Sequence, residues 1–255
     1  MFWNTVNETL KNSLLLLMKK EEFASFRLVG GTALTLHLGH RMSVDIDLFT
    51  DEPYRSIDFN AIEACLKNSF AYVHGDFGGN QVMGKSYLVG TDKDHVVKLD
   101  VYYSMDPFFQ PYVETDGVRM ATVEEIIAMK IDVIQRGGRK KDFWDLHELL
   151  LQYPINAMID LHRQRFEWTH DPNLIRKISP ILITPIQISI QFAFVGNNGS
   201  LSKRICSKHL VQNKLQKRQG VGRVSYSNSQ FMNCEFANTY LQKQKSLQKY
   251  SRGFY

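Results

Sequence analysis

The stretch LVGGTALTLHLGHRMSVDIDLF, residues 28–49, determines the predicted fold of this chain. Residues 27–29 predict a short strand, and the two glycines that follow allow a tight turn. Residues 32–38 have the apolar spacing of a helix, and residues 44–49 alternate in the manner of a strand. The sequence therefore predicts a strand, a glycine turn, a helix and a second strand in immediate succession.

The glycine turn indicates a site for phosphate. Gly30, Gly31 and Thr32 open the predicted helix, whose first backbone N–H groups have no partner within the helix. The positive end of the helix dipole lies at the same place and favours an anion. We therefore expect these three residues to hold a polyphosphate.

The second strand carries two carboxylates on one face. Period 2 places Val44, Ile46 and Leu48 on one side and Asp45 and Asp47 on the other. Carboxylates side by side repel each other, so a strand gains nothing from them unless cations lie between them. Carboxylate oxygens suit Mg²⁺, which also binds substrate phosphates, and we expect the two aspartates to coordinate two such ions.

This order of elements resembles a known superfamily. A strand, Gly-Gly-Thr, a short helix and Asp-x-Asp on the next strand look like the nucleotidyltransferases of the DNA polymerase β type. The longer string HRMSVDIDLF, residues 40–49, is similar to the AbiEii/AbiGii toxin family of nucleotidyltransferases. These are the toxin halves of bacterial toxin–antitoxin and phage-abortive systems. The resemblance implies an NTP substrate and a separately encoded antitoxin.

A third carboxylate is expected on a later strand, because two-metal phosphoryl transfer uses a further acid to share a metal ion or take the proton from the attacking hydroxyl. In HVVKLDVYY, residues 95–103, Lys98, Asp100 and Tyr102 alternate with apolar residues. On pattern alone this is a solvated edge strand. The family resemblance implies instead that Asp100 completes the triad, and we expect all three carboxylates to converge within reach of shared cations.

A helix is predicted over residues 122–135. Thr122 can serve as its N-cap, and Glu125, three residues later, can close a capping box. Lys130 lies among the apolar residues of this helix, where packing does not require a lysine. The pattern ends at Gly137-Gly138.

The following helix, predicted from Arg139, adds further candidates. In the family that the chain resembles, a helix lysine and an Arg/Lys-Lys-Asp-x-x-Asp segment help to hold the nucleotide. The resemblance implies this role for Lys130, Lys141, Asp142 and Asp145, and Ser43 is a candidate hydroxyl on the phosphate or metal side. The alternative is a pair of surface helices whose charges pair along the helix.

The predicted fold class is α+β, a nucleotidyltransferase-type mixed sheet with flanking helices followed by a small helical domain. We expect a catalytic domain over residues 1–121, a helical cap domain over 122–179 and a basic tail over 180–255. The expected helices lie at 5–22, 58–69 and 122–135 and from residue 139 onwards, and the expected strands lie at 26–29, 44–49, 70–76, 82–90 and 95–103.

The tail differs from the rest of the chain in charge and pattern. Residues 180–255 contain 11 Lys and Arg but a single acid, Glu235, whereas residues 1–179 contain 20 Lys and Arg and 25 Asp and Glu. The tail shows no sustained helical stripe and no series of strands separated by turns. We expect it to be disordered or to derive from a slip of the reading frame near Pro180. The alternative is a genuine basic appendage that binds RNA.

The composition favours a cytoplasmic protein. Three scattered cysteines, Cys65, Cys206 and Cys234, form no motif and suit a reducing compartment. The only apolar run near the start, residues 14–18, is too short for a signal peptide or a membrane span.

The predicted function is metal-dependent transfer of NMP from an NTP to an acceptor hydroxyl on tRNA or another cellular target. By resemblance, the protein is the toxin of a toxin–antitoxin or abortive-infection system. Two alternatives remain. One is an adenylyltransferase that modifies a small molecule such as an antibiotic, and the other is a catalytically impaired remnant that only binds nucleotide.

Overall fold

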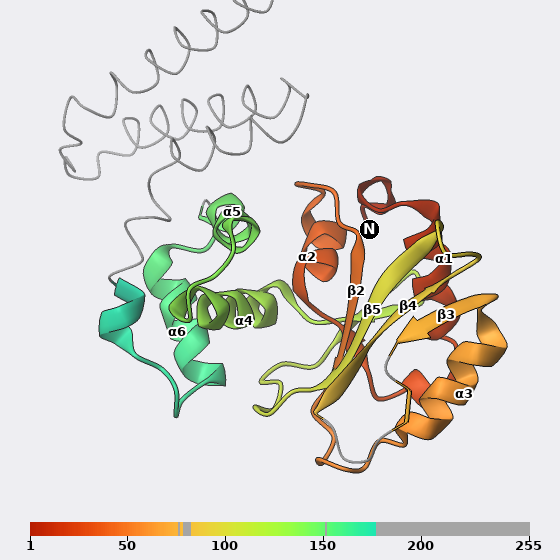
Figure 1. The fold of residues 1–255 in the computed structure, drawn as a ribbon. Coiled ribbons are helices and arrows are strands. Elements are labelled where there is room, and N and C mark those ends of the chain that lie inside the picture. Colours follow the sequence, from red (N-terminus) through yellow and green to blue (C-terminus); the bar gives the residue numbers. More distant parts are fainter. Residues whose placement is uncertain (76, 79–82, 151, 177–255) are drawn as a thin grey trace, which may run out of the picture. The chain divides into compact units, whose positions relative to one another are not determined.

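The computed structural model of the chain describes residues 1–75, 77–78, 83–150 and 152–176. All of them belong to one compact unit, which runs from Met1 to Leu182 (Figure 1). The tail predicted at 180–255 lies outside the described residues. Among the described helices, none has both the length and the apolar character needed to cross a bilayer.

The described residues form a seven-stranded mixed sheet with the order β3-β4-β5-β2-β1-β7-β6. At its centre, β2 runs parallel to β5 and antiparallel to β1. The strands are β1 (Arg27–Leu28), β2 (Asp45–Thr50), β3 (Tyr72–Gly75), β4 (Gly84–Gly90), β5 (Val96–Tyr103), β6 (Val113–Thr115) and β7 (Val118–Met120). The predicted α+β class and mixed sheet are confirmed. The sequence analysis missed β6 and β7, because three-residue strands are too short to show a period.

Six α-helices accompany the sheet in the described part of the chain. They are α1 (Glu8–Leu17), α2 (Gly30–Leu38), α3 (Phe59–Ser69), α4 (Val123–Gln135), α5 (Lys140–Leu149) and α6 (Ile155–Arg165), with 3₁₀ turns at Trp3–Thr5 and Glu21–Phe23. The helix predicted over 5–22 is therefore shorter than expected. Asn7 caps its start by accepting a hydrogen bond from the Leu10 N–H, and 3₁₀ bonds from Lys19 and Lys20 end it.

The alternation along β2 and β5 separates an apolar face from a polar face. Ile46, Leu48, Leu99 and Val101 are completely buried, and α1 packs across this apolar face of β2, β4 and β5 (Figure 1). Burial of each such side chain contributes about 1.5–3 kcal/mol. The acidic residues of both strands consequently lie together on the opposite face.

A buried ion pair between Glu125 and Arg165 connects the segment after β5 to the helices. The Thr122 hydroxyl accepts a hydrogen bond from the Glu125 N–H, as predicted, but the Glu125 carboxylate does not complete a capping box. It pairs instead with Arg165 at the end of α6 and accepts hydrogen bonds from the backbone of Phe109 and Gln110, each at 3.1 Å. Glu125 therefore joins α4, α6 and the segment after β5.

Candidate active site

The first two residues of α2 are glycines whose Cβ positions would lie very close to neighbouring side chains. Gly30 has a φ of +70°, and a Cβ atom there would lie 2.5 Å from Asp47 Oδ2. A Cβ atom on Gly31 would collide with the Arg41 guanidinium. No described side chain caps the first N–H groups of α2, since the N-cap residue is Val29. The helix N-terminus is thus available to a phosphate beside the Asp47 carboxylate.

The three predicted carboxylates lie on one face of two adjacent strands. β2 and β5 are parallel, and their register sets Asp47 opposite Asp100 and Asp45 opposite Lys98. The side chains of Asp45 and Asp100 retain 35% and 16% of their exposure, so neither is sealed in the core. This arrangement agrees with the shared face that the strand period predicted.

Asp47 is the most perturbed of the three carboxylates. Burial, followed by the negative charges of Asp100 and Asp45, raises its pKa to about 6. Within the described residues, no hydrogen bond or ion pair reaches its side chain. Hard oxygen donors that repel one another are the donor set that a divalent cation stabilises, so these residues fit Mg²⁺.

In this structure Asp45, Asp47 and Asp100 are not preassembled into a metal site. In the described part of the chain, no three His, Cys, Asp or Glu side chains are grouped closely enough to hold an ion together. Both oxygens of Asp100 are engaged elsewhere, at 2.5 Å from Ser86 Oγ and at 2.5 Å from Lys98 Nζ. Ser86 and Lys98 are thus the side chains that contact Asp100 in this structure, and the convergence of the three carboxylates on shared cations stays a prediction.

A second acidic centre lies in the helices at Asp145, which is completely buried. Arg41 holds it with two hydrogen bonds, of 2.6 Å from Nε and 2.9 Å from Nη2, and His40 Nε2 lies 2.7 Å away. Lys130 Nζ is 2.7 Å from its second oxygen. Burial alone would raise the pKa of Asp145, but the Arg41 and His40 hydrogen bonds hold it well below the usual value. Asp145 thereby anchors α4 and α5 to the loop before β2.

Lys130 and Asp142 also lie in this network. Lys130 is 5% exposed, and its Nζ atom is 2.8 Å from Asp142 Oδ1. The other Asp142 oxygen accepts hydrogen bonds from the Arg139 backbone at 3.0 Å and from its Nε at 3.2 Å. Burial opposes the ionisation of Asp142, yet Lys130 lowers its pKa. The structure thus places these two predicted nucleotide-binding residues in a buried ion pair.

Lys141 is the predicted residue of the helices that reaches the carboxylates. Its Nζ atom lies 3.8 Å from Asp45 Oδ2, and its side chain is 39% exposed. The hydroxyls of Thr32 and Ser43 are hydrogen-bonded to each other at 2.8 Å, and Thr32 donates to the Asp45 carbonyl. Both hydroxyls are buried, so in this structure they brace the start of β2.

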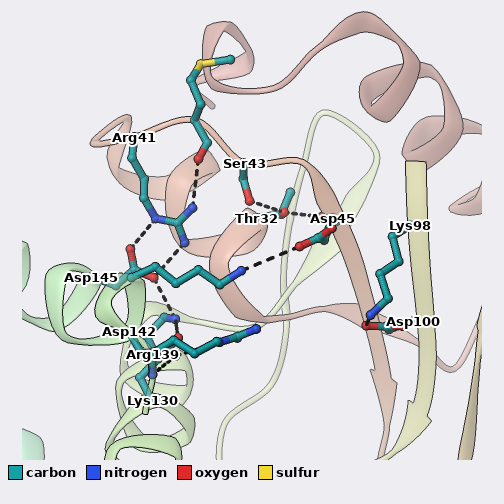
Figure 2. A network of polar contacts seen from close by, with 12 residues as sticks. Thr32, Arg41, Ser43, Asp45, Lys98, Asp100, Lys130, Arg139, Asp142 and Asp145 are labelled. Carbon is teal, nitrogen blue, oxygen red and sulfur yellow. Dashed lines mark hydrogen bonds and ion pairs between the residues drawn. The ribbon is translucent and has the colours of Figure 1, made fainter. Parts of the chain in front are cut away.

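Figure 2 shows how these groups are distributed. The Asp145 network lies toward the helices, the Lys98–Asp100 pair lies on the sheet, and Asp45 lies between them in this view. Lys141 and Lys98 are therefore the basic residues of this network that contact the carboxylates of the two strands.

Comparison of sequences decides the family. The profile described as "Nucleotidyl transferase AbiEii toxin, Type IV TA system" matches residues 14–197, more than half of the chain. The chain belongs to the AbiEii nucleotidyl transferase toxin family. The predicted family is thereby confirmed, and so is the nucleotidyltransferase class of enzyme to which the family belongs.

Individual relatives are more distant. An uncharacterized protein from Aquifex aeolicus is 28% identical over 139 residues, which are 50% of this chain and 59% of that protein. The chain thus spans about three-fifths of the length of this relative. A nucleotidyltransferase from Helicobacter pylori is 20% identical, with a TM-score of 0.46 over 82% of this chain and 94% of the other. The toxin MenT4 of Mycobacterium tuberculosis is 16% identical, with a TM-score of 0.41 over 58% and 59% of the two chains.

Two residues of this AbiEii family member were not selected from the sequence as site residues. Ser86 contacts Asp100 across the β4–β5 register, and Lys98 contacts it from two residues earlier on the same strand. Asp145 was matched to the family segment, but its contacts with a loop about 100 residues away could not be read from the sequence. Lys98 shares the polar face of Asp100 at i−2, which is the one signal that the sequence offered for it.

Proposed function

We propose that this chain transfers NMP from an NTP to an acceptor hydroxyl. The acceptor oxygen forms a bond to the α-phosphorus, the bond from that phosphorus to the bridging oxygen breaks, and pyrophosphate leaves. The observation that supports this reaction is the register of Asp47 and Asp100 on β2 and β5, next to the uncapped N-terminus of α2.

The triphosphate would lie at the start of α2. Gly30 and Gly31 let a phosphate approach the backbone N–H groups closely, and Thr32 holds the first turn of the helix against β2. Lys141 would add a positive charge from α5, since its ammonium is near Asp45 and partly exposed. These groups would stabilise the negative charge that builds up on the departing pyrophosphate.

Asp45, Asp47 and Asp100 would coordinate the magnesium ions. Two bound ions would polarise the α-phosphate and stabilise the attacking and leaving oxygens. Asp100, on the strand farther from the glycine turn, would orient the acceptor hydroxyl and take its proton. We assign it to the acceptor side because Gly30 and the phosphate site lie against Asp47.

The remaining predicted residues would support the residues that contact the nucleotide and the metal ions. Lys130 and Asp142 neutralise each other, so direct contact with the nucleotide requires that their ion pair open. In the closed arrangement they fix α5, and with it Lys141. Ser43 supports Thr32 through its hydrogen bond. We retain all of them as nucleotide-binding residues of the proposal.

The biological role follows from the family. As a member of a toxin family of type IV toxin–antitoxin systems, this chain would be a cytoplasmic toxin restrained by a separately encoded antitoxin. We propose tRNA or another cellular RNA as the acceptor. We further propose a catalytic domain over residues 1–121 and a helical cap domain over 122–179.

Incubation of the full chain with each labelled NTP, Mg²⁺ and either total tRNA or a small-molecule fraction tests the proposal. We expect label in RNA, and a loss of about a thousandfold or more in the Asp45→Ala variant. Asp94→Ala, at an exposed turn, is the matched control and should retain full activity. Label in small molecules would favour an antibiotic-type adenylyltransferase, and tight NTP binding without turnover would favour an inactive remnant.

A further inference from the structure

The two oxygens of Asp100 have different kinds of partner. Ser86 lies directly opposite Asp100 in the β4–β5 register and contacts Oδ1 at 2.5 Å. Lys98 lies two residues earlier on β5 and contacts Oδ2 at 2.5 Å. One partner is therefore a neutral hydroxyl from the neighbouring strand, and the other is an ammonium on the same strand.

The two partners also differ in how firmly they are held. The Ser86 side chain is short, lies on β4 between β3 and β5, and has a second contact, 3.3 Å from the Tyr102 hydroxyl. The Lys98 side chain is 48% exposed, and Asp100 is its ion-pair partner among the described residues. Release of Lys98 into water is consequently easy, whereas Ser86 can leave Asp100 only by a change of its χ1 rotamer, which also breaks its contact with Tyr102.

The charge of Lys98 acts on the whole acidic group. Its ammonium interacts with Asp45 and Asp47 as well as with Asp100, and the hydrogen bond to Asp100 is the main reason why the pKa of Lys98 is raised. It thus offsets the carboxylate repulsion that a divalent cation would also offset. Lys98 and a metal ion would use the same oxygen and relieve the same repulsion.

We propose that Ser86 is a positioning residue for Asp100 and that Lys98 is a displaceable counter-ion that competes with the metal ion for this carboxylate. The inference rests on the proposed function, in which Asp100 is a metal ligand. Ser86 keeps one oxygen of Asp100 fixed in both arrangements. Lys98 leaves the other oxygen when a cation binds and becomes free to contact a phosphate of the acceptor.

Binding of Mn²⁺ to the full chain, measured by the electron paramagnetic resonance signal of free Mn²⁺, tests both assignments. Lys98→Met removes the competitor and should tighten Mn²⁺ binding about two- to fivefold. Ser86→Ala should weaken it about tenfold or more, because a ligand that loses its hydrogen-bond support loses metal affinity. Ser86→Thr keeps the hydroxyl and should restore the affinity. A purely structural role for both residues would not shift the affinity in opposite directions.

Two matched controls and one further variant complete the experiment. Lys93→Met and Ser56→Ala alter exposed residues away from the carboxylates and should leave Mn²⁺ binding unchanged. If Ser86→Ala fails to fold, Ser86→Cys retains the size of the side chain with a weaker donor and should give the same direction. Unchanged or weaker binding by Lys98→Met, or unchanged binding by Ser86→Ala or Ser86→Cys, overturns the inference.

The Asp45→Ala variant separates this inference from the proposed function. It should bind Mn²⁺ far more weakly than the native chain. If it binds equally well, the proposed metal site is wrong and the inference falls with it. If it loses binding while Lys98→Met behaves like the native chain, the metal site stands and the counter-ion role alone is refuted.

Discussion

The carboxylate of Asp47 occupies the space that any side chain at Gly30 would need, since a Cβ atom there would lie 2.5 Å from Oδ2. The glycine turn and the acidic strand are therefore structurally interdependent. Because of this contact, a phosphate bound at the start of α2 would lie close to the face that carries Asp45, Asp47 and Asp100. The need for glycine comes from its neighbour as well as from its backbone angle.

Gly30→Ala should therefore lower the free energy of unfolding by more than backbone strain alone would. Gly117, in the β6–β7 turn, has a φ of +76° and nothing near its Cβ position, so Gly117→Ala isolates the strain. We expect that control to lose about 1–2 kcal/mol of unfolding free energy and Gly30→Ala to lose about 2–5 kcal/mol, together with nucleotidyl transfer. Urea denaturation compares the two, and equal losses would remove Asp47 from the explanation.

Asp47→Asn should stabilise the protein while it abolishes transfer. The pKa of Asp47 in the fold, about 6, lies above the ordinary 3.8, so its stabilising contribution is complete below pH 3.8 and is lost as the pH rises through 6. We expect the variant to be about 1–3 kcal/mol more stable than the native chain at about pH 8 in EDTA, and equally stable at about pH 4. Asp94→Asn serves as the exposed control. A stability difference that does not change with pH would contradict the assignment.

The sequence predicted which carboxylates share a face better than it predicted which side chains contact them. Local periods were sufficient to place Asp45, Asp47 and Asp100 on one face, because alternation is a property of each strand alone. The contact of Asp100 with Ser86 depends on how β4 and β5 align, and no single-strand pattern contains that register. Lys130 was recognised as unusual in its helix, but its ion pair with Asp142 depends on the packing of α4 against α5.

Asp145→Asn should be among the most destabilising substitutions of the helices. The change leaves Arg41, His40 and Lys130 around a buried neutral group, and loss of one partner of a buried ion pair costs about 3–5 kcal/mol. The matched control is Asp160→Asn, whose side chain is 53% exposed beside Arg163 and should cost less than about 1 kcal/mol. Thermal denaturation of both variants measures the difference. A small effect at Asp145 would mean that the anchor between the loop and the helices is not needed for stability.

Lys141→Met tests whether α5 contributes directly to nucleotide binding. Its ammonium is partly exposed and lies 3.8 Å from Asp45, so its removal should change the stability by less than about 1 kcal/mol. If it contacts the triphosphate, the KM for NTP should rise about tenfold, as expected for loss of one charge-assisted phosphate contact. The neighbouring Lys140→Met, at an exposed position, controls for net charge and should leave KM unchanged. Equal effects of the two substitutions would indicate general electrostatic attraction, and Lys141 would then have no specific place in the site.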